Sequence, residues 1–549
     1  MKRMLSIILS LLVLFSFSSF AFAVPLSTEG SQIPLVLLGG DGDTLYDKDG
    51  NYLFQIDDLG HLVEGSDSKE LLRSVANVLQ PFLLQGLLFN QWEPYYEALE
   101  EEIAELTEGV RLDENGNPVN GSDISKAHRD EVRSNMTTDK KGSKGYYGFQ
   151  DYRFWYDWRL DPMEVADELN AYIEGICTAT GAEKVALAGR CVGCNIMLAY
   201  LAKYGYDRIY GFGLDGTSSN GGEFISEAIS GKFHLDGPAV ERFLTDYDEL
   251  GMLQVSDFVM ATVDLLVKSG AVERLTAATR ATIYDKVVKG VTSALSTSTF
   301  FTMPCYWGFV RAEDYDAAIE YVFGAPGSEK RTQYAGLIEK LDRYHTDVVE
   351  QIPTLMQGLA DRNINIAIIS KYGFQIVPTC ESSDALADQY ASVKNSSFGA
   401  TTSTVYGTLP AEYIAAREAE GKGRYISPDR QIDASTCLFP DSTWFTKGAR
   451  HGNWTRTENE LMYTVTTADH QLTIDDFELT QFMVWDSENK TMVPMTAENC
   501  QTEYWVADAS VDHPTSFLQR LRNYFSALKV WLEQLFSVLK TKITQKAAA

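Results

Sequence analysis

The sequence is poor in residues that bind zinc and in positive charge. Only seven of its 549 residues are cysteines and seven are histidines, and no cysteine pair has the spacing of a zinc site at both ends. Lys and Arg number 47 against 76 Asp and Glu, a net charge of −29. Such a chain repels polyanions, so we expect no nucleic-acid partner, and nothing implies a metal or other cofactor.

Long apolar runs are also missing, except at the N-terminus. The stretch MKRMLSIILSLLVLFSFSSFAFA has a basic start, an apolar run and Ala-Phe-Ala before Val24. This pattern is typical of a secretory signal peptide cut after Ala23, with a membrane anchor as the alternative. We therefore expect residues 1–23 to be a signal peptide and the protein to be secreted. The odd number of cysteines leaves at least one thiol free unless two chains are bridged.

A strand, a sharp turn and a helix follow one another in VALAGRCVGCNIMLAYLAKYG, residues 185–205. The apolar run at 185–188 predicts a buried strand, the later Ile and Leu positions predict a helix, and Gly205 is a helix C-cap. Between them stands Gly-x-Cys-x-Gly. Many hydrolases carry a nucleophilic serine at the centre of Gly-x-Ser-x-Gly in this context, so Cys191 is the candidate nucleophile. A small structural residue at a retained turn is the alternative.

The order of elements predicts an α/β fold with a mostly parallel sheet and helices on both faces. A strand follows at RIYGFGLDG, and after a long helical pattern the strand NINIAIISKYG resumes the sheet. We expect a core in two parts, 24–217 and 360–510. The segment 218–359 between them is expected to be a helical insertion, either a lid or a subdomain without a gating role.

The C-terminal segment 511–549 has a different character. Seven apolar residues recur at helical spacing: Leu518, Leu521, Phe525, Leu528, Leu532, Leu535 and Leu539. The polar face is basic. The pattern predicts an amphipathic helix that lies on a membrane or envelope surface, or one that docks on its own domain.

A cysteine nucleophile needs a base, and the base needs an acid. In this fold order the histidine comes last, which favours His451 in KGARHGNW over His470. The acid should lie shortly before it. Asp429 in SPDRQID is the first choice, ahead of Asp433 and of Asp384 in SSDALAD, although loop aspartates are usually turn formers.

The turn also supplies the electrostatics of the reaction. The N-terminus of the following helix carries a positive partial charge, which lowers the pKa of a cysteine placed there. An oxyanion needs two backbone N–H donors. We expect one from Val192 and the other from Gly40 or Asp41 in LLGGDGD, where glycine permits a close backbone approach.

Several of these segments together resemble the lecithin:cholesterol acyltransferase-related branch of the α/β-hydrolase fold. PLVLLGGDGDTLYD resembles its oxyanion loop, FWYDWRLDP its Tyr-Asp-Trp-Arg segment and LAGRCVGCNIMLAYL its Gly-His-Ser-x-Gly turn, with Arg-Cys in place of His-Ser. SPDRQID and ARHGNW resemble its acid and histidine loops, although SPDRQID lacks the glycine that follows the acid in the family. The likeness runs from about Pro34 to Trp454, and the helical insertion matches poorly.

The resemblance implies an acyl-enzyme made from a lipid ester. It puts Cys191 in the role of nucleophile, His451 in that of base and Asp429 in that of acid. Asp157 and Arg159 of the Tyr-Asp-Trp-Arg segment are expected to be buried structural partners rather than catalysts.

The sequence thus predicts a secreted enzyme that acts on a lipid-like or small acyl ester through an acyl group on Cys191, as hydrolase or O-acyltransferase. The alternative is a catalytically inactive protein that binds a lipid or envelope component on the same scaffold. Neither function requires a cofactor.

Overall fold

The computed structural model describes residues 33–40, 45–46, 52–54, 77–119 apart from 79, 152–232, 299–449, 451, 455–477 and 480–500, together with single residues between 239 and 294 and in the tail. The predicted signal peptide lies outside these residues. So does most of the predicted tail helix, of which Arg522, Phe525 and Lys529 are helical and exposed. In the part of the chain that the structure describes, no helix is long and apolar enough to cross a membrane.

The chain divides into two compact units. Residues 1–233 and 290–500 form one, and residues 234–289 and 501–549 form the other. Nearly all described residues belong to the first unit, which holds the sheet and every side chain discussed below.

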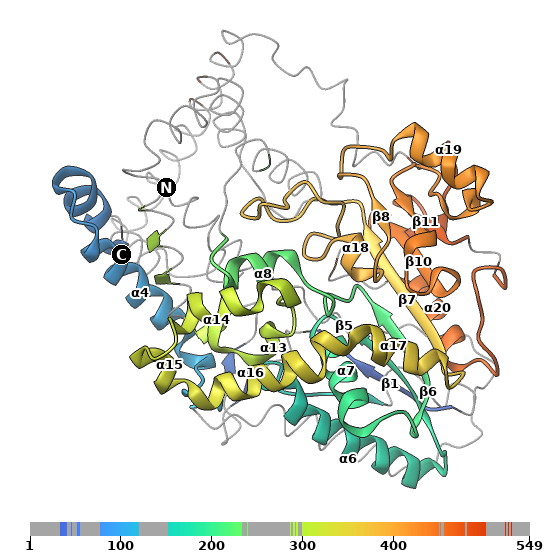
Figure 1. Ribbon diagram of the computed structural model, residues 1–549, viewed down its shortest axis with the longest axis horizontal. Helices are drawn as coiled ribbons and strands as arrows, with labels where there is room; N and C mark the ends of the chain where they lie inside the picture. The colour runs from blue at the N-terminus through green and yellow to red at the C-terminus, as the bar shows by residue number, and fades with distance from the viewer. Residues whose placement is uncertain are drawn as a thin grey trace, which may run out of the picture. The chain divides into compact units, whose positions relative to one another are not determined.

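Eight strands form one sheet, in the order β12-β11-β10-β7-β6-β5-β1-β4 (Figure 1). Neighbours run parallel except β11 and β12, which pair antiparallel at the edge. The strands are β1 Leu35–Leu38, β4 Arg153–Phe154, β5 Val185–Arg190, β6 Ile209–Asp215, β7 Asn365–Tyr372, β10 Thr443–Lys447, β11 Phe482–Asp486 and β12 Thr491–Pro494. Two small antiparallel pairs lie apart from it: β2 Leu45–Tyr46 with β3 Tyr52–Phe54, and β8 Thr401–Thr402 with β9 Ile432–Asp433.

Helices make up most of the remaining described elements. They are α4 Glu93–Thr107, α6 Pro162–Thr180, α7 Val192–Tyr204, α8 Glu223–Ile229, α13 Pro304–Trp307, α14 Tyr315–Phe323, α15 Glu329–Gln333, α16 Ala335–Asp347, α17 Ile352–Ala360, α18 Val393–Ser396, α19 Ala411–Ala419 and α20 Arg456–Thr467. A π-helix, η1 Pro81–Leu88, precedes α4, and short 3₁₀ turns are η2 Glu108–Val110, η4 Thr299–Thr302, η5 Ala312–Asp314, η6 Val349–Gln351, η7 Gly423–Tyr425, η8 Ala434–Thr436 and η9 Pro440–Ser442.

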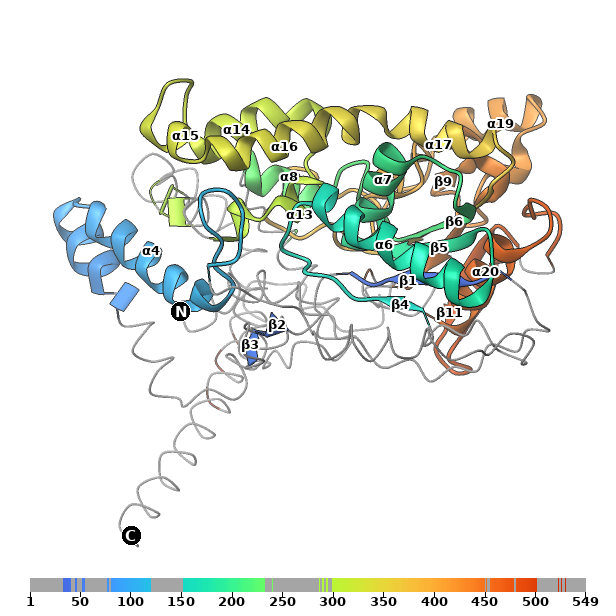
Figure 2. The same cartoon turned by 90° about the horizontal axis from the view of Figure 1, so that it is seen from below.

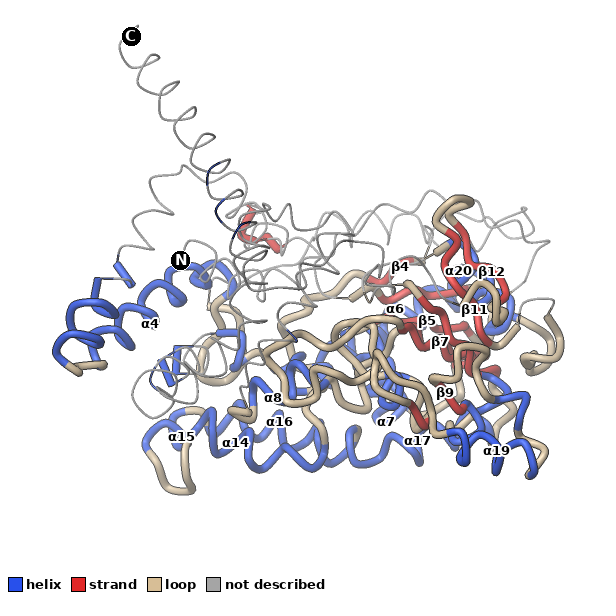
Figure 3. The backbone as a smooth tube through the Cα atoms, turned by 90° about the horizontal axis from the view of Figure 1, so that it is seen from above, coloured by secondary structure: helices blue, strands red, loops and turns tan. Residues whose placement is uncertain are grey.

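Helices cover both faces of the sheet, as the near-continuous apolar strands require. Along β5, Val185 and Leu187 belong to the core beneath α6, α7 and α17, and Ala186 and Ala188 face the core beneath α20 (Figures 2 and 3). This alternation follows from the two-residue period of a strand. The expected α/β fold with a mostly parallel, doubly covered sheet is confirmed.

Glycine allows α20 to lie directly on β6. A Cβ atom added at Gly211 would come within 1.9 Å of the Thr466 carbonyl oxygen, and one added at Gly213 within 2.0 Å of Met462 Sδ. Gly211 and Gly213 are therefore positions where a larger residue would push α20 away from β6.

Between β6 and β7 the described residues form helices and no strand. Helices α13 to α17 of the predicted insertion belong to the same compact unit as the sheet, and α16 and α17 pack on α7 (Figure 2). The segment 299–360 therefore extends the helical layer on one face of the sheet. Whether part of 218–359 acts as a lid stays a prediction.

Candidate active site

Cys191 occupies a strained turn between β5 and α7. It has φ 48° and ψ −123°, a left-handed φ that residues other than glycine rarely adopt. The strain has a local cause, because β5 ends at Arg190 and α7 begins at Val192. A single residue must therefore turn the chain from strand to helix, and such strain persists only where the surrounding structure enforces it.

The two glycines of Gly-x-Cys-x-Gly make this turn possible. A Cβ atom on Gly193 would lie 2.6 Å from the carbonyl oxygen of Gly39 and 2.7 Å from that of Leu38, both backbone atoms. One on Gly189 would lie 2.4 Å from Met197 Sδ. The backbone is thus too crowded for a side chain on either side of Cys191.

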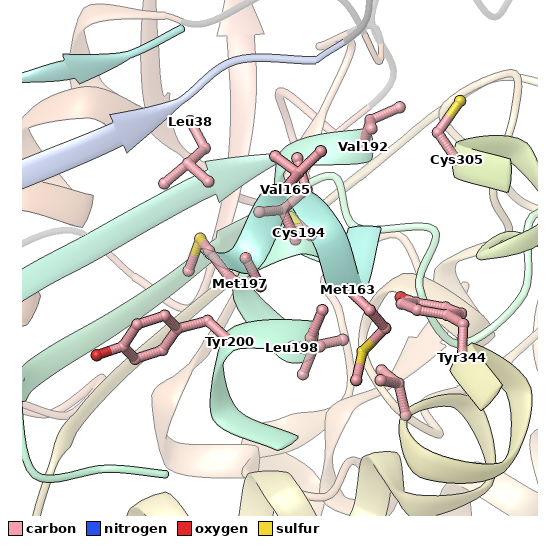
Figure 4. Close-up of a cluster of buried hydrophobic side chains, with 14 of the residues drawn as sticks. Leu38, Met163, Val165, Val192, Cys194, Met197, Leu198, Tyr200, Cys305 and Tyr344 are labelled. Carbon is pink, nitrogen blue, oxygen red and sulfur yellow. The ribbon is translucent and has the colours of Figure 1, made fainter. Parts of the chain in front are cut away.

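A buried apolar cluster holds α7 in place. Cys194, Met197 and Leu198 point from α7 into side chains that include Leu38 of β1 and Val165 of α6 (Figure 4). Burial raises the pKa of the Cys194 thiol to about 12, so Cys194 is an inert neighbour of Cys191.

The loop after β1 lies across the turn from Cys191. A Cβ atom added at Gly40 would be 3.2 Å from Cys191 Cβ and 3.9 Å from its Sγ. The Tyr156 hydroxyl donates a hydrogen bond to the Gly39 carbonyl oxygen and so fixes this loop. Val192 opens α7, where backbone N–H groups have no acceptor within the helix. Gly40 and Val192 thus both lie next to Cys191. That their N–H groups bind an oxyanion stays a prediction, and Asp41 lies outside the described residues.

A buried His–Asp pair stands at the neighbouring strand ends. His451 Nδ1 lies 2.7 Å from Asp388 Oδ2, and the His451 backbone N–H donates to the Asp388 carbonyl oxygen at 3.3 Å. The Asp388 side chain is fully buried. Its Oδ1 accepts from the N–H groups of Tyr390 and Ala391 at 3.1 and 3.0 Å. Next to an ionised carboxylate, which can only accept, Nδ1 is the donor and Nε2 keeps the lone pair that a base needs.

Backbone register brings this pair close to Cys191. Arg190 of β5 is paired with Asp215 of β6, so Cys191 and Gly216 directly follow the last paired residues of adjacent parallel strands. A Cβ atom on Gly216 would lie 3.5 Å from Asp388 Oδ2 and 3.7 Å from His451 Nδ1. The candidate nucleophile and the His–Asp pair therefore share the carboxyl edge of β5 and β6.

The acid predicted from sequence is not the one that the structure places at His451. Asp429 Oδ2 accepts from Lys447 Nζ at 2.9 Å and from the Tyr372 hydroxyl at 3.0 Å. The assignment of Asp429 is therefore corrected to Asp388, since Asp429 neutralises a buried lysine of β10.

The other acid candidates and His470 also lie elsewhere. Asp433 is buried, accepts from the Tyr413 hydroxyl at 2.8 Å and caps a short 3₁₀ turn through the Ser435 N–H. Asp384 is exposed. His470 is exposed and pairs with its neighbour Asp469. Asp384 in SSDALAD is therefore not the partner of His451, which pairs with Asp388, the last aspartate of the same segment.

Two carboxylates of α8 anchor the loop that carries Asp388. Glu223 accepts from the Ser392 N–H and from Asn395 Nδ2, each at 2.8 Å. Glu227 accepts from the Glu381 N–H and from the Ser382 hydroxyl, each at 2.6 Å. Burial raises the pKa of Glu223, opposed by its bonds to Ser392. Neither glutamate was predicted, because the pairing joins segments far apart in sequence.

A buried ionic network lies beneath the same strand ends. Lys371 Nζ is 3.1 Å from Asp215 Oδ2 and 3.9 Å from Glu458 Oε2, and Arg190 Nη2 is 3.8 Å from Asp215 Oδ2. Burial raises the pKa of Asp215 to about 6, opposed chiefly by Lys371. Burial lowers the pKa of Arg190 to about 10, opposed by Asp215. Arg190 is thus part of the support beneath the turn.

The remaining predicted features concern cysteines, metals and the aromatic segment. All seven cysteines are buried, and none of them, Cys191 included, forms a disulfide. Arg159 and Asp157 form the expected buried pair, with Nε to Oδ1 at 2.9 Å and Nη2 to Oδ2 at 2.7 Å. Within the described ranges no group of three or more His, Cys, Asp or Glu side chains is placed to hold a metal ion.

Comparison with known proteins assigns no family to the chain. A scan against protein-family models matches none, and a search of curated proteins finds no match. What the site does must be inferred from its own geometry.

Proposed function

We propose that this protein is an acyl-transferring enzyme of the α/β-hydrolase type, with Cys191 as nucleophile, His451 as base and Asp388 as acid. One observation carries the proposal: a cysteine held at φ 48° between β5 and α7, beside a buried His–Asp pair on the same strand edge. Strained, non-glycine turn residues concentrate at functional sites. A buried histidine oriented by a carboxylate is the arrangement that activates a thiol or hydroxyl.

The reaction follows from these groups. His451 Nε2 takes the proton of the Cys191 thiol, and the thiolate sulfur attacks the carbonyl carbon of an acyl ester. The N–H of Val192 and a donor of the loop at Gly40 stabilise the negative charge on the carbonyl oxygen. The C–O bond to the alcohol then breaks, and the proton on His451 passes to the departing alkoxide. An acyl thioester remains on Cys191.

Water or a second alcohol completes the cycle. His451 Nε2 takes a proton from the incoming hydroxyl, whose oxygen attacks the thioester carbonyl. The C–S bond breaks, and the sulfur recovers the proton from His451. The products are a carboxylic acid with water and a new ester with an alcohol, so one site serves hydrolase and O-acyltransferase alike.

Alkylation of the thiol tests this proposal without knowledge of the substrate. Cys191 should react with iodoacetamide at mildly acidic pH, where an ordinary cysteine of pKa about 8.5 barely reacts. Peptide mapping by mass spectrometry across a pH series gives the rate at Cys191. Cys194, one turn further along α7 and fully buried, is the internal control and should stay unlabelled.

Two variants make the test decisive. His451→Ala should shift labelling of Cys191 to higher pH, because the thiolate loses its imidazolium partner. Cys191→Ala should abolish cleavage of p-nitrophenyl esters while far-UV circular dichroism stays unchanged. If Cys191 follows an ordinary thiol curve in both parent and His451→Ala, the catalytic proposal fails and a non-catalytic binding protein takes its place.

A further inference from the structure

A tight turn carries the acid of the candidate triad. Ala387 and Ser392 form an antiparallel bridge, and the Asp388 N–H donates to the Ala391 carbonyl oxygen at 3.2 Å. Gln389 and Tyr390 are therefore the two central residues of a hairpin turn. Gln389 has φ 96°, a conformation that normally selects glycine at the first central position of such turns.

The surrounding structure fixes this turn. Asp388 Oδ1 accepts from two N–H groups of the turn, and Glu223 of α8 accepts from the Ser392 N–H. The strain at Gln389 is therefore imposed by anchors on either side, and glycine would relieve it.

The side chain of Gln389 makes the position more unusual. Gln389 is only 1 % exposed, yet in the described part of the chain neither its Nε2 nor its Oε1 has a hydrogen-bond partner. A buried amide without partners loses its hydrogen bonds to water and forms none with the protein. Such groups are therefore rare in folded proteins. Gln389 thus lowers the stability of the fold through both its backbone and its side chain. Its presence is therefore better explained by a role in function than by a role in folding.

The neighbours of Gln389 point to that reason. Asp388 on one side binds His451 Nδ1, and the ring of Tyr390 on the other lies 5.0 Å from the His451 ring, centre to centre. Both chain neighbours of Gln389 thus contact the candidate base.

We propose that Gln389 is a specificity-determining residue whose amide hydrogen-bonds a neutral hydroxyl or carboxamide group of the substrate beside His451. An amide offers donors and an acceptor together, and a hydroxyl or carboxamide can satisfy both. A hydrocarbon group satisfies neither, and a carboxylate only the donors. The inference rests on the proposed function and narrows its substrates to acyl esters that carry a neutral polar group near the scissile bond.

Matched esters test the inference. One pair differs by a hydroxyl on the acyl side, p-nitrophenyl lactate against p-nitrophenyl propionate. The other differs on the alcohol side, ethylene glycol monopropionate against ethyl propionate. For each pair the ratio of kcat/KM, hydroxylated over plain, is measured for the parent, Gln389→Leu and Gln389→Gly. Asn363→Gly, which relieves a left-handed φ of 54° at an exposed residue after α17, is the control for strain relief.

In one pair or the other, the parent should prefer the hydroxylated ester, and both Gln389 variants should lower the ratio by about three- to tenfold. Gln389→Gly should also raise the thermal midpoint, because it removes the strain. Asn363→Gly should leave the ratio unchanged.

The remaining outcomes separate the two proposals. If the Gln389 variants lower kcat/KM for all esters equally, with the ratios unchanged, Gln389 is structural and the inference is overturned while the proposed function stands. If the parent shows no preference in either pair, the inference is likewise overturned. If the parent cleaves none of the four esters, the proposed function fails and the inference falls with it.

Discussion

The side chains of Asp388 and Asp429 are both buried but bind different partners, a histidine and a lysine. Asp388→Asn should lower kcat by about a thousandfold or more, because an amide no longer fixes the proton of His451 on Nδ1. Asp429→Asn should instead lower the free energy of unfolding by about 3 kcal/mol, because Lys447 loses its charge partner, with kcat per folded molecule little changed. Steady-state kinetics and urea unfolding of both variants distinguish them. A larger loss of kcat in Asp429→Asn would return the role of acid to Asp429.

The residues of the site differ in how well sequence predicts them. Cys191 and His451 lie in short patterns whose glycines show a tight turn, and their order along the chain matches the expected one. Asp388 has no such local pattern. It meets His451 because the loop after β7 folds back and is anchored to α8, which is a property of tertiary structure. For the same reason, local sequence did not reveal that Lys447 and Tyr372 engage Asp429.

At the scale of elements, the junction of β5 and α7 depends on how closely β1 passes over it. Gly193→Ala should lower the free energy of unfolding by about 1–3 kcal/mol, because its Cβ would meet two backbone carbonyl oxygens that have no side-chain freedom to move. It should also slow alkylation of Cys191, because α7 must shift away from β1.

Gly205 at the other end of α7 is the matched control. It has φ 73°, and a Cβ there would meet nothing within 4 Å. Gly205→Ala should therefore cost only left-handed strain, about 1–2 kcal/mol, and leave the rate of alkylation at Cys191 as in the parent. Equal effects of the two substitutions on alkylation would refute the link between β1 and the turn.

The sequence predicts which segments are strands and helices better than it predicts which of these elements pack on one another. Apolar runs identify β5, β6 and β7 because strands buried on both faces need no polar positions. The helical character of the segment between β6 and β7 is equally visible. Its docking on α7 through α16 and α17 is not visible, because an amphipathic helix packs as readily on a neighbouring subdomain as on the sheet that precedes it.

For the whole molecule, the buried ionic network of Asp215, Lys371 and Arg190 makes the free energy of unfolding depend on pH. The pKa of Asp215 is raised from 3.8 to about 6, so the folded protein binds this proton more tightly than the unfolded chain does. Its contribution to stability therefore falls as pH rises from about 4 to about 6 and is constant above. Acidification from pH 7 to 5 should raise the urea midpoint of the parent relative to that of Asp215→Asn. All other groups titrate in both proteins, so the difference between the two curves of urea midpoint against pH isolates Asp215. Parallel curves would show that Asp215 does not titrate between pH 5 and 7.

The strand order has a kinetic consequence. Asp388 and His451 are 63 residues apart. Cys191 precedes Asp388 by 197 positions and His451 by 260, in a sheet that must pair β5 with β6, β6 with β7 and β7 with β10. Contacts between such distant segments form late, because closing long loops costs entropy before it gains contacts. During refolding Cys191 should therefore behave as an ordinary thiol until the last of these strands is in place. The rate of alkylation at Cys191 during refolding would then show when the sheet is complete.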